Sequence, residues 1–180
     1  MRPTDGDRSE YFRGLFRSGC AEVESGRIAV RDASPPALRI ALTLIYAGRL
    51  EEAATSPFPP SPFAEALKAF GPVPGPAPSL SPVLPAADLM GALSLCRMFL
   101  LPAGAQLCRD AVLRRLSPAT VIDTLIWADA NADDALRGAA LAYALSNFSA
   151  IRESHPAALE TLAAAPRDLM LEVLRGLNLK

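Results

Sequence analysis

The chain has 180 residues, of which 51% are hydrophobic and 21% charged, a composition typical of a globular protein that can bury a core. Its 18 basic and 19 acidic residues give a formal net charge of -1, with no basic stripe to neutralise phosphates, which argues against nucleic acid as a partner. Arg, Asp or Pro interrupts every apolar run before a bilayer-spanning length, which argues against a membrane span.

The cysteines are odd in number and far apart, at Cys20, Cys96 and Cys108. Residues 1–10 are too polar to form the apolar core of a signal peptide. We therefore expect reduced thiols and a location in the cytoplasm, the nucleus or both.

The first predicted element is a helix over residues 9–18. Ser9 is a suitable N-cap, and Phe12, Leu15 and Phe16 follow at the spacing of one helical face. The sequence therefore predicts an amphipathic helix at the start of the chain.

Two more elements follow before residue 50. Residues 27–31 predict a short strand, because Ile28 and Val30 alternate on one side. Ser34-Pro35 predicts a helix start, because serine caps free amides and proline needs no amide donor in the first turn. The buried stripe of that helix is expected to contain Leu38, Ala41, Leu42 and Ile45.

Residues 55–85 have a different composition. Ten of the 17 prolines lie between Pro57 and Pro85, with Glu65 and Lys68 as the only charges there. Proline removes amide donors and fixes the backbone, so the stretch is expected to be a loop-like surface insertion. A ligand for a proline-recognising domain is the alternative.

Everything from residue 86 onward favours helices. One helix is predicted over 86–99 and another over 102–115, and Ser117-Pro118 repeats the cap-and-proline start. The inward face of the second helix is expected to contain Leu107, Cys108, Ala111 and Val112. These elements predict a pair of packed helices followed by a third.

The last third predicts further short helices. Asn131 is expected to cap a helix whose first turn holds Asp133 and Asp134, and Pro156 and Pro166 each open another. The last helix is expected to bury Leu169, Val173, Leu174 and Leu177. Together the elements predict an α+β fold, mainly α, in which antiparallel helix pairs follow a small strand region.

The first half of this order resembles the BTB/POZ family, particularly the speckle-type POZ proteins. Residues 8–16 (RSEYFRGLF) are similar to that family's "RS-x-hydrophobic-F-x-x-M/L-F" helix. Residues 28–38 (IAVRDASPPAL) are similar to its strand and turn, and residues 45–48 (IYAG) to its "IYTG" helix end. The resemblance implies the C-terminal part of a BTB/POZ fold.

The second half agrees with this resemblance. Residues 98–122 are similar to the closing helices of the BTB/POZ domain, and residues 121–151 to the helix pair that follows it. The resemblance implies a partial BTB/POZ domain at 1–116, which contains the proline-rich insertion at 55–85. A BACK-like helical extension is implied at 117–180.

Two departures from the family pattern affect this prediction. A complete domain has further strands and its main dimer helix ahead of the position of Arg8, where this chain has seven residues. Homodimerisation is therefore left open, and a start placed too late in the gene is one explanation. The insertion at 55–85 is also longer than the family's usual connection.

The resemblance also implies a docking site for a Cullin-3-type scaffold. Adaptor members carry an apolar residue, any residue and a glutamate after the first helix, which fall here on Cys20, Ala21 and Glu22. Phe16 and Tyr46 complete the implied partner-binding set. An apolar side chain beside one charge suits a binding hot spot, and an ordinary polar loop after a helix is the alternative.

No catalytic, cofactor or metal site is expected. His155 is the only histidine, and no nucleophile-elbow sequence occurs; a catalytic triad would also need a nucleophile and an acid that the fold positions beside the histidine. One histidine and three scattered cysteines do not make a zinc site. Cys96 and Cys108 are expected in the core.

The sequence therefore predicts a non-enzymatic substrate adaptor of a Cullin-3 ubiquitin ligase, which would act by positioning an unknown substrate protein. The alternatives are a BTB oligomerisation scaffold without a ligase link and a truncated paralogue without function.

Overall fold

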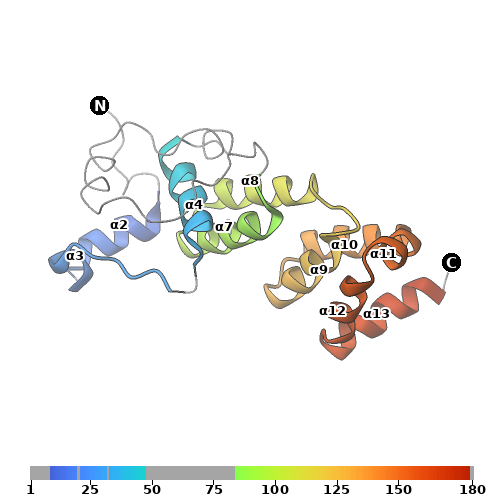
Figure 1. Cartoon of the computed structure of the whole chain (residues 1–180). Coiled ribbons are helices and arrows are strands. Elements are labelled where there is room, and N and C mark those ends of the chain that lie inside the picture. Colours follow the sequence, from blue (N-terminus) through green and yellow to red (C-terminus); the bar gives the residue numbers. More distant parts are fainter. Residues whose placement is uncertain (1–8, 20, 32, 48–83, 179–180) are drawn as a thin grey trace, which may run out of the picture. The chain divides into compact units, whose positions relative to one another are not determined.

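A computed structural model describes residues 9–19, 21–31, 33–47 and 84–178 (Figure 1). These residues are mainly helical, which confirms the mainly α prediction. The chain divides into two compact units, Met1–Cys108 (unit 1) and Arg109–Lys180 (unit 2). The division falls inside one helix, so the predicted boundary after residue 116 stays a prediction. Nearly all of the proline-rich insertion lies outside the described residues.

The strand predicted at 27–31 is wrong, because these residues have no regular secondary structure. A strand needs a neighbour to pair its backbone groups, and none of the described residues forms one. The segment instead leaves helix α3 (Ala21–Ser25) at Gly26, whose φ of 62° suits glycine. The Arg27 amide donates to the Glu22 carbonyl at 3.2 Å and closes this turn.

In unit 1, Ser9 fixes both the start and the position of helix α2 (Glu10–Arg17). Its hydroxyl accepts a hydrogen bond from the Phe12 amide at 3.3 Å, which confirms the predicted cap. The same hydroxyl donates to the carbonyl of Phe99 at 2.6 Å, and Ser9 is buried. One side chain therefore caps α2 and attaches it to the end of helix α7 (Ala86–Met98).

Aromatic rings strengthen this attachment. The Phe12 ring centroid lies 4.9 Å from that of Phe99, 5.2 Å from Tyr11 and 6.0 Å from Phe16. Such pairs contribute about 0.5–1.5 kcal/mol each beyond the area they bury. Phe12 and Phe99 are buried, whereas Phe16 is 51% exposed.

Helix α4 (Pro35–Ala47) packs on α7, as Figure 1 shows. Its predicted start is confirmed, because the Ser34 hydroxyl accepts from the Ala37 amide at 3.2 Å. The two helices approach closely: a Cβ added at Gly91 would lie 2.9 Å from the Cβ of Ala37. Helix α8 (Pro102–Leu113) contributes the buried Cys108, which hydrogen-bonds with Cys96 on α7.

Unit 2 consists of the end of α8 and five further helices, α9 (Val121–Ala130), α10 (Asp134–Ser146), α11 (Phe148–Ser154), α12 (Pro156–Ala163) and α13 (Arg167–Asn178). The buried residues of its core cluster are Val121, Ile122, Leu125, Ala140, Ala144, Ile151, Leu162, Leu169 and Val173. The predicted burial of Leu174 is wrong, since it is 46% exposed. Its neighbour Val173 takes the inward position four residues after Leu169, and successive helical residues point about 100° apart.

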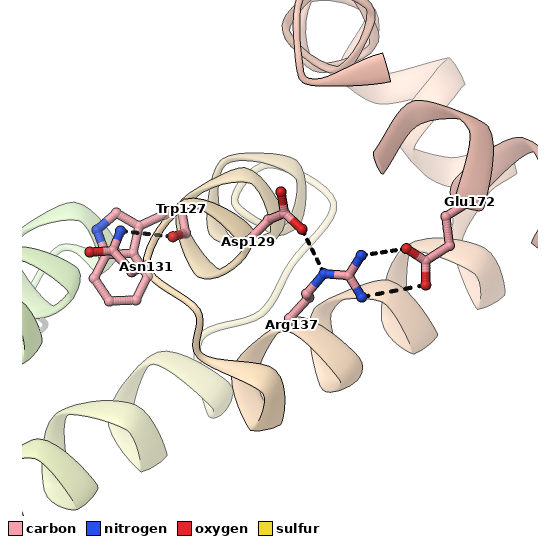
Figure 2. Close-up of polar contacts among 5 residues, drawn as sticks. All are labelled: Trp127, Asp129, Asn131, Arg137 and Glu172. Atoms are coloured by element: carbon pink, nitrogen blue, oxygen red, sulfur yellow. Dashed lines mark hydrogen bonds and ion pairs between the residues drawn. The ribbon is translucent and has the colours of Figure 1, made fainter. Parts of the chain in front are cut away.

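The predicted cap of α10 was misplaced by two residues. Asp133, and not Asn131, is the N-cap, and its carboxylate accepts from the Leu136 amide at 3.1 Å. Asp133 is also buried and accepts from Arg109 Nε at 3.0 and 3.1 Å. Asn131 instead ends α9, where its side-chain amide donates to the Trp127 carbonyl (Figure 2).

The predicted helix start at Ser117-Pro118 is also displaced, because α9 begins at Val121. The Ser117 amide donates to the Thr120 hydroxyl at 3.1 Å, and that hydroxyl donates to the carbonyl of Arg115. Residues 118–120 form a turn in which Thr120 satisfies groups on both sides. Hydrogen bonds of the Thr120 side chain therefore hold residues 117–120 in a turn, and the helix begins only after them.

Arg137 joins three helices of unit 2 (Figure 2). From α10 its Nε donates to Asp129 on α9 at 2.7 Å, and its terminal nitrogens pair with Glu172 on α13. These bonds raise the pKa of Arg137 above its ordinary value, first through Glu172 and then through Asp129. The guanidinium therefore stays charged, and the link depends on its two acidic partners.

Candidate protein-docking groove

Unit 1 carries an apolar groove of about 280 Å³, here called the Phe16 groove. Its walls come from α2, the non-helical segment after α3, α4 and the residue that ends α7. The lining residues are Phe12, Phe16, Gly26, Ile28, Val30, Leu38, Leu42, Ile45, Tyr46 and Phe99. Three of the side chains reach well into solvent: Phe16 is 51% exposed, Ile28 37% and Tyr46 36%.

The groove forms because α2 and α4 bury one part of their apolar surface and expose another. On α2, Phe12 turns into the aromatic cluster while Phe16, one turn later, stays at the surface. On α4, Ile45 is buried while Tyr46 is exposed. Exposed apolar side chains that gather in one hollow mark a binding surface more often than scattered ones do.

Two of the four predicted partner-binding residues meet in this groove. Phe16 and Tyr46 lie 30 positions apart in the sequence, and both line it. Glu22 is exposed on α3, outside the lining set. Cys20 falls outside the described residues, so its predicted role as an apolar anchor stays a prediction.

Two lining residues that we did not predict as part of a site had a recognisable pattern in the sequence. Ile28 and Val30 alternate, and we interpreted this alternation as a strand. Both side chains line the groove without any strand pairing. Alternation therefore identified which side chains share a side, but not what they face.

A second hollow of unit 1, of about 680 Å³, has a mixed lining of Glu10, Arg13, Cys96, Arg97, Leu100, Leu101, Pro102 and Ala105. Leu100 is 54% exposed and has a φ of 54°, a backbone conformation that favours glycine. Cys96 is buried, and the hydrogen bond with Cys108 together with burial raises the pKa of its thiol well above the ordinary value. A thiol held neutral in this way is a poor nucleophile at neutral pH.

Within the described part of the chain, no group of three or more His, Cys, Asp or Glu side chains could hold a metal ion. The carboxylates near residue 130 are engaged otherwise, since Asp133 caps a helix and Asp129 pairs with Arg137. Across the same described ranges, no helix has both the length and the apolar character to cross a bilayer.

A scan against models of protein families finds no match for this chain. A search of the curated proteins also finds none that matches it. The resemblance to the BTB/POZ family therefore remains a prediction based on the residues quoted above, while the groove is a property of the structure.

Proposed function

We propose that this chain is a protein-interaction module that docks on a Cullin-3-type scaffold through the Phe16 groove. In this proposal it is a partial BTB/POZ domain with a BACK-like extension, works as a substrate adaptor and contributes no catalytic residue. The observation that carries the proposal is that Phe16 and Tyr46, which the family resemblance marked for partner binding, line one apolar groove.

The size and lining of the groove favour a protein partner. Pockets that enclose small-molecule ligands usually measure about 300–1,000 Å³ and bury most of the ligand. The Phe16 groove, at about 280 Å³, lies at the lower end of this range and is bordered by three exposed apolar side chains. It suits one or two apolar side chains that protrude from the surface of a partner protein.

Polar groups near the groove add the charged element of the proposed interface. Glu22 and Glu24 are both exposed on α3, and Gly26, the residue that follows this helix, belongs to the groove lining. An anionic rim beside an apolar centre steers a basic partner surface and fixes its orientation. Of the two, the resemblance selects Glu22.

The described thiols agree with action in the cytosol or nucleus. Cys96 and Cys108 are both free thiols, although they hydrogen-bond with each other. Reducing compartments keep such thiols unpaired. The substrate protein would bind outside the Phe16 groove.

The test measures binding of the purified cullin N-terminal domain to the full chain by calorimetry. We expect Phe16→Ala to weaken binding at least about tenfold, because a central aromatic anchor typically contributes 2 kcal/mol or more. Leu174→Ala is the matched control, since Leu174 is similarly exposed but lies in unit 2. Equal affinities for the two variants would contradict the groove as the docking site.

A second pair of variants tests the charge. Glu22→Lys and Glu24→Lys make the same change on the same short helix, and both residues are exposed. Only Glu22→Lys is expected to weaken binding, by at least about tenfold for a paired interfacial charge. If the unmodified chain does not bind the cullin but Phe16→Ala abolishes self-association in sedimentation experiments, the oligomerisation scaffold replaces the adaptor.

A further inference from the structure

We propose that Ser34 is a phosphorylation site for a proline-directed protein kinase, independently of cullin docking. Such kinases take a serine that is followed directly by proline, as Ser34 is followed by Pro35. Ser34 is exposed, and the described residues before it, 27–31 and 33, have no regular secondary structure. A kinase cleft takes its substrate in extended form, so the approach to Ser34 requires little unfolding.

The helix start after Ser34 is also easy to open. Pro35 and Pro36 have no amide hydrogen, so the first turn of α4 has few bonds to lose. Three bonds of Ser34 would break. The Ala37 amide donates to the Ser34 hydroxyl at 3.2 Å, the Leu38 amide donates to the Ser34 carbonyl at 3.0 Å, and the Ser34 hydroxyl donates to the Asp88 carboxylate at 3.5 Å. Helix ends with few bonds fray at low cost.

The described chain contains a natural contrast at Ser117-Pro118. Ser117 is only partly exposed, and its amide and hydroxyl both contact the Thr120 hydroxyl at 3.1 Å. The amides of the three residues before it donate to carbonyls of α8. The same dipeptide is therefore held in a bonded turn at Ser117 and presented in an open segment at Ser34.

The modification has a defined effect on its surroundings. The kinase transfers the γ-phosphoryl group of ATP to the Ser34 oxygen, the hydroxyl proton leaves, and ADP is released. The Ser34 hydroxyl donates to the Asp88 carboxylate on α7 at 3.5 Å, and phosphorylation removes this donor. It places a group of charge about −1.5 to −2 beside the carboxylate, which opposes the α4–α7 contact by repulsion.

The experiment uses the full chain with Ser56, Ser61 and Ser81 replaced by alanine. These are the other serines followed by proline, and they lie outside the described residues. The chain is incubated with a cyclin-dependent kinase and Mg-ATP, and phosphate is located by mass spectrometry. We expect Ser34 to be modified at least about tenfold faster than Ser117. A tenfold ratio corresponds to a modest difference between the free energies of local opening at the two serines.

Two peptides that span residues 27–40 and 110–124 serve as unfolded controls, and Ser34→Ala is the negative control. If the first peptide is phosphorylated but Ser34 in the folded chain is not, the proposal is wrong. Equal modification of Ser34 and Ser117 in the folded chain would also overturn it, because the structural contrast would then have no consequence.

The repulsion is tested with Asp88→Asn. Phosphorylation should change the thermal midpoint of both chains, and the midpoint of the phosphorylated native chain should come out lower relative to its unphosphorylated form than that of the variant. We expect the difference between the two shifts to be about 2–4 °C for a chain of this size. An identical shift in both chains would contradict the predicted contact between the phosphate and Asp88.

Discussion

Unit 1 and unit 2 are both helical, but they differ in how much of their apolar surface is buried. Unit 2 packs its apolar side chains into one cluster and links its helices with buried or half-buried ion pairs. Among the described residues, five of the six large apolar side chains that remain exposed belong to unit 1: Phe16, Ile28, Tyr46, Met98 and Leu100. The difference is that unit 2 buries most of its large apolar side chains, whereas the described part of unit 1 leaves several of them at the surface.

The largest expected effect tests this difference directly. Leu125→Ala should destabilise unit 2 by about 2–5 kcal/mol, because Leu125 is fully buried and its removal leaves a cavity. Phe16→Ala should cost less, about 1–2 kcal/mol, because half of the side chain is already in water and only its ring pair with Phe12 and the buried half are lost. Urea titrations followed by far-UV circular dichroism measure both changes.

Trp127 makes the assignment to a unit possible, because it is the only tryptophan and lies on α9 of unit 2. Its fluorescence should follow the loss of stability in Leu125→Ala. A Phe16→Ala chain that unfolds as easily as Leu125→Ala would show that Phe16 holds the fold, and the comparison between the units would fail.

The prediction with an intermediate effect tests how tightly α4 and α7 of unit 1 pack against each other. Gly91→Ala should destabilise the chain by about 1–2 kcal/mol, because the new Cβ would lie 2.9 Å from Ala37 Cβ between α4 and α7. Gly138→Ala on α10 is the control, since no atom lies within 4 Å of its added Cβ. That change should stabilise the helix by up to about 1 kcal/mol.

Thermal melts of the two glycine variants provide the measurement. If Gly91→Ala is as stable as Gly138→Ala, then α4 and α7 can separate freely, and the groove is a product of loose packing. Recovery of stability in the double variant Gly91→Ala with Ala37→Gly would confirm that the contact itself is responsible.

The smallest expected effect concerns the ion pairs of unit 2. Arg137→Met should cost about 0.5–1 kcal/mol, because the pairs with Asp129 and Glu172 are only partly shielded from solvent. The cost should shrink in 1 M NaCl, where the Debye length is about 3 Å. Arg152→Met, at an exposed position of α11, should show neither effect. A cost for Arg137→Met that is independent of salt would indicate lost packing of its stem instead.

Local signals in the sequence were sufficient for much of the helical order. Ser9 and Ser34 each accept a hydrogen bond from a free amide at a helix start. Pro156 has no amide hydrogen, and an amide in the first turn would have no partner within the helix. These helix starts were therefore predictable from residue type. The mainly α character followed from the 3.6-residue spacing of apolar side chains. Cap and spacing act within a few residues, so they need no knowledge of the fold.

The features that depend on residues far apart in the sequence were decided only by the tertiary structure. The alternation at Ile28 and Val30 was compatible with a strand, but a strand exists only where a neighbour pairs with it. Asp133 rather than Asn131 caps α10, and it also accepts from Arg109, 24 positions earlier. The Phe16 groove belongs to the same class, because the space between helices depends on how they pack, and residue type and local spacing do not determine that packing.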